Sequence, residues 1–591
     1  MIRRPPRSTL SSSSAASDVY KRQASLRVIV DYTETDEVCC NAAPLFYGAA
    51  QGAIAIAGGT SLPSGAATTY QTFGGSYANP FDYEVATSPN TAEESVEDYG
   101  ISGELNWDFG ETALTVIGAY RKHDNYNFLD ADFTNLELFD RENIQDIDET
   151  SLEIRWASTG SKTVDWTAGF FYFKQNNDYT TGLQFGEDSI PYANVLAAAL
   201  LGGNPFVDTP FSDANAAING AFPALAGTWW SADDRSYSNT EYEAESVAVF
   251  GQATWNIDEQ LSLTLGLRYS DEEKSADFHW EGDYAFGNVP SALVGALAAF
   301  QTGSPYDDFS TDYDDDNISG TISLNYLISE EFSVYGRIAQ GYKAGGINMD
   351  RSAPGQAPGA PTPNPDGTHF DPETVDSFEI GFKSRLLENT LTLNGAVFYQ
   401  ELEDYQQNSF DGLNFTVRNA ATVEGKGIEF DYMYAPNESW LFSGGVTFQD
   451  IAYGEFKNGS PTAWQAPGSL QDLSGKPVLF TSDTTLAGLI SYTMPINDSL
   501  NFIAATTYSY STEYFTGQDN DPITQQDDYW IFNLNFSLAS ADDTWQVDLW
   551  GKNVGDEEIY NIVFDTPLQR GSYHAYVREP MTWGMTGRLR F

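Results

Sequence analysis

The feature that most constrains this chain is a side-chain polarity that alternates with a period of two. In the segment 261–270, LSLTLGLRYS, four leucines and a tyrosine share one face, and the other face is polar or small. Successive side chains of a strand point to opposite faces, so the pattern predicts a strand with one apolar face. The same pattern recurs from Ala24 to the end of the chain and predicts about eighteen amphipathic strands. If the apolar face meets lipid, Arg268 must face inward, since a lipid-facing arginine costs up to ~4 kcal/mol at the midplane.

The connections between these strands alternate in length. Short turns on one side and long loops on the other are typical of bacterial outer-membrane barrels, in which the short turns are periplasmic. We therefore expect an all-β fold, a large antiparallel transmembrane β-barrel with extracellular long loops. The short links are 108–111, 158–162, 256–260, 329–331, 387–389, 435–439, 495–499 and 540–543, and the long links are 36–95, 127–145, 180–240, 279–312, 346–372, 407–415, 455–480, 515–525 and 556–575.

Composition agrees with a barrel. Aromatic residues make up 14% of the chain, as expected if they form girdles at both membrane interfaces. The formal net charge of -55 excludes nucleic-acid binding, which needs clustered cations. We assign most of the acid to loops, for example the run DYDDDN at 312–317. Such loops are either solvated, or they bind divalent cations that bridge to lipopolysaccharide, or they attract a cationic substrate.

The first 23 residues differ from the rest. They carry five basic residues and one acidic residue, and no apolar stretch follows that would suit a signal peptide. The segment resembles translated sequencing-adaptor readthrough and is expected to be disordered. We therefore expect the folded domain to be 24–591.

Four stretches resemble TonB-dependent outer-membrane receptors of the siderophore-receptor type. They are GRIAQGYKAGGIN (336–348), the segment 373–406, KNVGDEEIYN (552–561) and REPMTWGMTGRLRF (578–591). The resemblance implies a barrel of about 22 strands, closed by an N-terminal plug domain and energised by TonB. On this basis we expect a barrel that is truncated at its N-terminus and lacks the signal peptide, the TonB-binding segment, the plug and about four strands.

The resemblance also suggests site residues. The barrel motif, expected to end a strand and begin a loop, comprises Gly341, Tyr342, Lys343, Ala344, Gly345, Gly346 and Asn348. The four positions 342–345 depart from the Phe-Arg-Ala-Pro motif of the family's haem-uptake branch. His369 in the following loop either ligates iron or is simply an exposed loop histidine.

The end of the chain and several loop residues carry further hypotheses. Trp583, Leu589 and Phe591 are expected to form the C-terminal signal that the barrel-assembly machinery reads. The loop tryptophans Trp229, Trp230 and Trp280 either contact ligand, anchor loops or touch lipopolysaccharide. The adjacent Cys39 and Cys40 either form a strained vicinal disulfide or pair elsewhere.

No catalytic or metal-binding motif is present, so we expect neither an enzyme nor a bound cofactor. The resemblance implies an outer-membrane receptor and transporter for a scarce, bulky nutrient, most often a ferric siderophore. Its partners would be TonB, outer-membrane lipid, lipopolysaccharide and a ferric chelate. Two alternatives remain open, a passive substrate-specific porin and a non-transporting surface barrel that serves adhesion or lipopolysaccharide contact.

Overall fold

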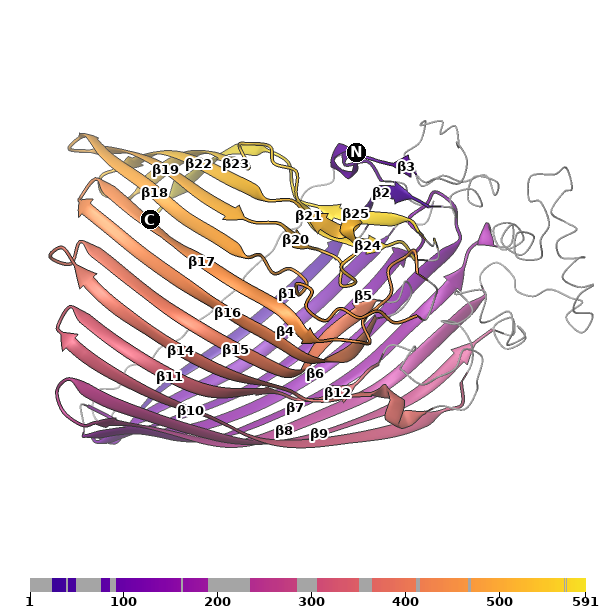
Figure 1. Cartoon of the computed structure of the whole chain (residues 1–591), viewed down its shortest axis with the longest axis horizontal. Helices are drawn as coiled ribbons and strands as arrows, with labels where there is room; N and C mark the ends of the chain where they lie inside the picture. The colour runs from indigo at the N-terminus through magenta and orange to yellow at the C-terminus, as the bar shows by residue number, and fades with distance from the viewer. Residues whose placement is uncertain are drawn as a thin grey trace, which may run out of the picture.

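A computed structural model describes residues 24–38, 41–48, 76–85, 92–160, 163–189, 234–283, 306–349, 364–410, 415–465, 469–567, 569 and 571–590. Eighteen strands of this part form one antiparallel sheet, which confirms the expected number (Figure 1). They are β1 (Ala24–Glu37), β4 (Glu93–Asp108), β5 (Thr112–Asp130), β6 (Phe139–Ser158), β7 (Val164–Phe185), β8 (Arg235–Asn256), β9 (Leu261–Gly282), β10 (Phe309–Ser329), β11 (Phe332–Lys343), β14 (Glu373–Leu386), β15 (Leu391–Phe410), β16 (Phe415–Asn437), β17 (Trp440–Glu455), β18 (Thr484–Asn497), β19 (Leu500–Ser511), β22 (Tyr529–Ser540), β23 (Trp545–Lys552) and β26 (Thr582–Leu589).

Each of these strands pairs with the next one along the chain, from β1–β4 through to β23–β26. The sheet curls so that the early strands form the rear wall and the late strands the front wall in Figure 1. Among the described residues no register joins β1 to β26, so these two are the edge strands of the sheet. Within the same part of the chain, no helix is long and apolar enough to cross a membrane.

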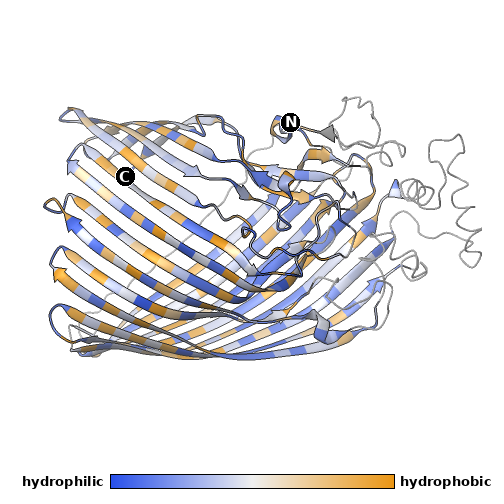
Figure 2. Ribbon diagram, viewed as in Figure 1, coloured by the Kyte–Doolittle hydropathy of each residue, from blue (hydrophilic) through white to orange (hydrophobic). Residues whose placement is uncertain are grey.

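The two faces of the sheet are inverted relative to a soluble protein. Large apolar side chains stand exposed on the outer face, such as Leu267 at 68% and Ile380 at 72%. Small or polar side chains on the inner face are buried, such as Ala248, Ser270 and Ala396. Figure 2 shows the resulting alternation of hydrophobic and hydrophilic residues along the strands. An exposed apolar band of this extent suits a lipid environment rather than water.

Outward-facing tyrosines limit the apolar band towards the long loops. Tyr120 donates a hydrogen bond to Asp148 on the neighbouring strand, 2.5 Å away. Tyr172 likewise donates to Glu245 on the neighbouring strand, and Tyr399 donates to Glu401 on its own strand. A tyrosine with an apolar ring and a polar hydroxyl suits a membrane–water boundary.

The strands are longer than the sequence predicted, and two of the loop assignments were wrong. The acidic run 312–317 lies inside β10 rather than in a loop, paired with residues 270–275 of β9. Aspartate has low β-propensity, so a propensity argument misplaces such a run, whereas cross-strand hydrogen bonding holds it in the ladder. For the same reason the connection between β5 and β6 is 131–138 rather than 127–145.

Small sheets fold over the long-loop end of the barrel. One contains β24 (Tyr560–Asp565), β25 (Tyr573–Val577), β2 (Ala43–Tyr47) and β3 (Ser76–Tyr77). Two further two-stranded sheets are separate from it, β12 (Gly346–Ile347) with β13 (His369–Phe370), and β20 (Tyr514–Phe515) with β21 (Gln525–Gln526). Three short 3-10 helices complete this end, η1 (Pro80–Asp82), η4 (Pro365–Thr368) and η5 (Pro522–Thr524). Here lie apolar clusters such as the one that contains Leu45, Val563 and Tyr573, so this end has a packed core of its own.

Candidate functional site

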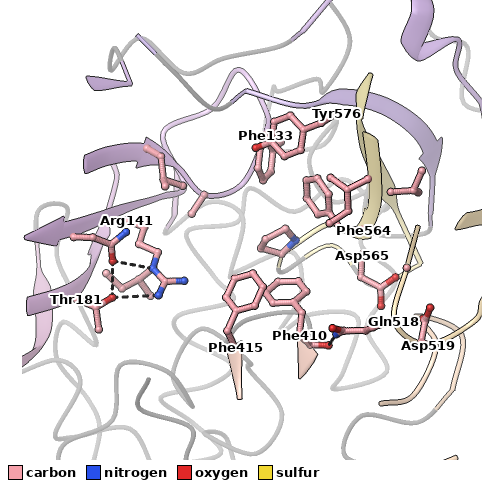
Figure 3. Close-up of a pocket in the computed structure, with 18 of the residues that line it drawn as sticks. Phe133, Arg141, Thr181, Phe410, Phe415, Gln518, Asp519, Phe564, Asp565 and Tyr576 are labelled. Carbon is pink, nitrogen blue, oxygen red and sulfur yellow. Dashed lines mark hydrogen bonds between the residues drawn. The ribbon is translucent and has the colours of Figure 1, made fainter. Parts of the chain in front are cut away.

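A cavity of about 500 Å³ lies at the long-loop end of the barrel (Figure 3). Its walls come from both the inner face of the barrel and the small sheets. A site of this size, mostly apolar with a few polar groups, is typical of small-molecule binding. The lining residues are Leu129, Ala131, Phe133, Arg141, Asn143, Tyr179, Thr181, Gly182, Leu183, Ser236, Ser238, Phe410, Phe415, Leu479, Thr516, Gly517, Gln518, Asp519, Thr524, Ile562, Val563, Phe564, Asp565, Pro567 and Tyr576.

Aromatic rings form two opposite sides of the cavity. On one side, the ring centroid of Phe564 lies 5.4 Å from that of Phe133 and 5.5 Å from that of Tyr576. Across the cavity the rings of Phe410 and Phe415 lie 4.8 Å apart. Flat apolar walls of this kind can hold an aromatic or a hydrophobic ligand surface.

The backbone of Phe133 is strained, and hydrogen bonds to nearby carboxylates hold it in that conformation. Its φ is 53°, which is unfavourable for a side chain of this size. The Asp130 carboxylate accepts the Phe133 N–H at 3.1 Å, and the Asp132 carboxylate accepts the N–H groups of Leu138 and Phe139 at 3.2 and 3.0 Å. Burial raises the pKa of the Asp132 carboxyl. Backbone strain held in this way is common at ligand sites.

His574 supports the aromatic wall from behind. Its ring lies 5.3 Å from that of Phe133, and its Nδ1 is 2.6 Å from the hydroxyl oxygen of Thr566. Burial lowers the pKa of His574 to about 3. The imidazole is therefore neutral at physiological pH and acts as a packing group.

One end of the cavity carries a cation. The guanidinium of Arg141 on β6 donates hydrogen bonds to Asn143 and Thr181, both at 3.3 Å (Figure 3). Asn143 also accepts a hydrogen bond from the Thr181 hydroxyl at 2.8 Å. This network fixes the plane of a group that suits carboxylate or other oxygen-rich ligands.

The other end of the cavity is acidic. Asp519 and Asp565 line it, and Asp521 lies close by and accepts a 2.6 Å hydrogen bond from Tyr573. Burial, more than the charge of Asp521, raises the pKa of Asp519 to about 6. Burial and then the charges of Asp519 and Asp521 raise the pKa of Asp565 well above its usual value. The cavity is therefore dipolar, with aromatic walls between a cation and an acidic group.

The barrel motif lies outside this cavity and forms a structural joint. β11 ends at Lys343, as expected for the start of a loop. Tyr342 donates a hydrogen bond to Asp315, and the carbonyl oxygens of Ala344 and Gly345 accept from Gln406 and Lys274.

Gly346 and Asn348 continue the joint. Gly346 pairs with Phe370, and its Cα lies against the ring of that residue. The buried Asn348 side chain donates to the Val417 carbonyl at 3.2 Å and accepts its N–H at 2.7 Å. These bonds fix the entry to the loop, and no residue from 341 to 348 lines the cavity.

The other residues singled out in the sequence are dispersed. His369 lies 2.7 Å from the Thr311 hydroxyl and stacks edge-on against Tyr313, 5.4 Å between centroids. Trp280 donates a 2.9 Å hydrogen bond to Ser236, which lines the cavity, so it supports the wall. Among the described residues, no group of three or more His, Cys, Asp or Glu could hold a metal ion.

At the end of the chain, Trp583 and Leu589 are exposed on the outer face of β26. Phe591, Trp229, Trp230, Cys39 and Cys40 lie outside the described residues.

Sequence reasoning missed the cavity because its residues come from separate connections. Phe133 and Phe564 are 431 positions apart, and neither belongs to a recognisable motif. One general indication is present in the sequence: these residues lie in long links, where aromatic residues stand beside turn residues.

Comparison with known proteins identifies the family. A model of the TonB dependent receptor-like beta-barrel matches residues 133–554. The pesticin receptor of Yersinia pestis is 27% identical over 212 residues, which are 35% of this chain and 27% of that receptor. The catecholate siderophore receptor Fiu of Escherichia coli O6:H1 is 25% identical over 365 residues, 60% of this chain and 43% of that receptor. The chain thus matches less than half the length of these curated relatives.

Solved structures share the fold. The ferric yersiniabactin uptake receptor FyuA from Yersinia pestis superposes with a TM-score of 0.62 and 15% identity, over 98% of this chain and 74% of that one. The siderophore receptor PiuA from Acinetobacter baumannii gives a TM-score of 0.64 and 15% identity, over 98% and 73%. The relatives and the fold are those of receptors rather than enzymes. The chain belongs to the TonB-dependent receptor family, of which it carries the β-barrel.

Proposed function

We propose that this chain is the barrel of an outer-membrane receptor that captures a ferric chelate at its long-loop end. The main support for this proposal is the cavity, because its size, its aromatic walls and its oppositely charged ends suit a small molecule. It lies among the long connections, which in this proposal face the cell exterior, with the short turns in the periplasm. Similar proteins named as pesticin, catecholate siderophore and ferric yersiniabactin receptors support an iron chelate as the ligand.

In this proposal the captured chelate crosses the barrel by an energy-dependent step. A plug domain gates the passage, and TonB, driven from the inner membrane, opens it. Trp583, Leu589 and Phe591 form the signal by which the assembly machinery inserts the barrel. Lipopolysaccharide and outer-membrane lipid contact the outer face, whose apolar band and tyrosine boundary suit that environment.

A binding titration tests the capture step. The full chain, folded in detergent micelles, would be titrated with ferric catecholate, ferric hydroxamate and ferric citrate while tryptophan fluorescence is recorded. We expect one ferric chelate to bind at micromolar concentration or below, and its iron-free form to bind more weakly. Phe564→Ala should weaken this binding at least tenfold, since it removes a wall of the cavity.

Phe448→Ala is the matched control, because it removes the same ring from the exposed outer face of β17. It should leave the affinity unchanged. Absence of binding by every chelate to a correctly folded chain would contradict capture. If the chain also showed a permanently open conductance in a planar bilayer, a passive porin would replace the receptor.

A further inference from the structure

We infer that the ligand of this cavity carries a positively charged nitrogen beside an aromatic or apolar surface, and that Asp519 and Asp565 hold the nitrogen. The inference rests on the proposed function, since it names the ligand class of the same cavity. It selects cationic or zwitterionic amine-bearing chelates from among the many classes of ferric chelate.

Within the described part of the chain, no basic side chain neutralises the three acids at this end of the cavity. Asp519, Asp521 and Asp565 lie close enough for their charges to repel one another. Among the described residues, no lysine or arginine forms an ion pair with any of the three. Carboxylates gathered in a partly dry site without a cation are costly, and a ligand cation would remove that cost.

The three carboxyl groups differ in their hydrogen bonding. Asp521 receives the hydroxyl of Tyr573 at 2.6 Å, and Asp519 accepts the N–H of Asp521 at 3.1 Å. The side chain of Asp565, the last residue of β24, has no hydrogen bond or ion pair with another described residue, and its carboxyl lines the cavity (Figure 3). A half-buried carboxylate that lines a cavity and has no protein partner points to a donor that arrives with the ligand.

An aromatic surface lies beside the acids. Phe564 precedes Asp565 and presents its ring to the cavity between Phe133 and Tyr576. The face of an aromatic ring attracts a cation, and a carboxylate next to it strengthens the attraction. The two features together favour an ammonium or guanidinium group with apolar atoms attached.

Arg141 fixes the direction of such a ligand. It lies across the cavity from Asp519 and Asp565 and is held by Asn143 and Thr181. An oxygen-rich or anionic end would therefore turn towards Arg141, and the nitrogen towards the acids. A purely anionic chelate would be attracted at one end and repelled at the other.

Three small probes with the same phenyl ring test the charge preference directly. Phenethylammonium, 2-phenylethanol and phenylacetate would be titrated into the folded full chain, and binding measured by saturation-transfer NMR. At pH 7.5 phenethylammonium should bind at least tenfold more tightly than phenylacetate. The double variant Asp519→Asn/Asp565→Asn should remove this preference and leave 2-phenylethanol binding unchanged.

Glu513→Gln is the matched control, because it removes one negative charge from an exposed position. Glu513 lies just before the β20–β21 hairpin, which contains Asp519. It should behave as the parent chain. Lowering the pH to 5 should weaken phenethylammonium binding, because burial raises the pKa of Asp519 to about 6 and its carboxylate takes up a proton in this range. The Asp→Asn changes remove charge repulsion and keep one acceptor oxygen, so the variants should fold. A difference in gel mobility between unheated and heated samples would confirm folding. If the double variant fails to fold, Asp565→Asn alone carries the test.

The outcomes separate the two proposals. Equal binding of the anionic and cationic probes, or an unchanged preference in the asparagine variants, would overturn the ligand class. Ferric chelate binding without charge preference would overturn only this inference and leave the receptor in place. A cation preference without binding of any ferric chelate would instead overturn the proposed function.

Discussion

Replacing Ile380 with arginine should destabilise the barrel strongly, because the side chain lies in the middle of the exposed apolar band. Ile380 is 72% exposed and is paired with the exposed Val397 on β15. It stands six residues before Leu386, the last residue of β14 at the short-turn end. At ~3.4 Å per residue and a tilt of ~45°, its depth is about 14 Å, close to the centre of a hydrocarbon layer of ~30 Å.

The cost follows from this depth. Arginine on the lipid face of a barrel costs ~2–4 kcal/mol at the midplane and ~0–1 kcal/mol near the interface. The unfolding equilibrium constant should therefore change roughly 30- to 900-fold for Ile380→Arg, since ~1.36 kcal/mol is a factor of ten. Leu387→Arg is the matched control, because Leu387 is 62% exposed but lies in the short turn that follows β14. It should cost at most about 1 kcal/mol.

Denaturant unfolding of the full chain in phospholipid vesicles measures both values. Tryptophan fluorescence would follow unfolding, and gel mobility without heating would report the folded fraction at each denaturant concentration. Equal costs for the two substitutions, both near zero, would mean that the outer face does not meet hydrocarbon. The membrane-spanning interpretation of the sheet would then be wrong.

Three further predictions concern the long-loop end. Asn348→Ala should cost ~1–3 kcal/mol and speed amide exchange at Val417, because it leaves a buried backbone pair without its partner. Gly345→Ala should cost ~1–3 kcal/mol and increase cleavage of the adjoining loop by protease, since a Cβ there would meet the Tyr313 hydroxyl. For Asp519, the pKa rises from 3.8 unfolded to about 6 folded. Ionisation of the Asp519 carboxyl therefore destabilises the folded state. This effect is absent below pH 3.8, grows with pH and reaches about 3 kcal/mol above pH 6. Asp519→Asn should abolish that slope in a series of unfolding curves at pH 4 to 7.

The sequence by itself determined the wall of the barrel. A period of two is a local property of a strand, so the segment 261–270 alone separates the lipid-facing Leu267 from the inward-facing Arg268. Turn residues are also local, which is why the short links, such as the one between β9 and β8, were placed correctly. The ends of the strands at the long-loop side were placed less well, because cross-strand pairing rather than propensity sets them, as the acidic run in β10 demonstrates.

Only the tertiary structure decided the site. Phe133, Arg141, Phe410, Asp519 and Phe564 lie on different connections and strands, and no periodicity relates one of them to another. They meet because the sheet curls and brings the long connections to one end, where the loops pack on each other through side chains far apart in the chain. The conspicuous glycine-rich motif at 341–346, by contrast, serves the joint between strand and loop. A local sequence pattern determines the backbone geometry of its own segment. A cavity depends on which segments come together, and that is decided by the whole fold.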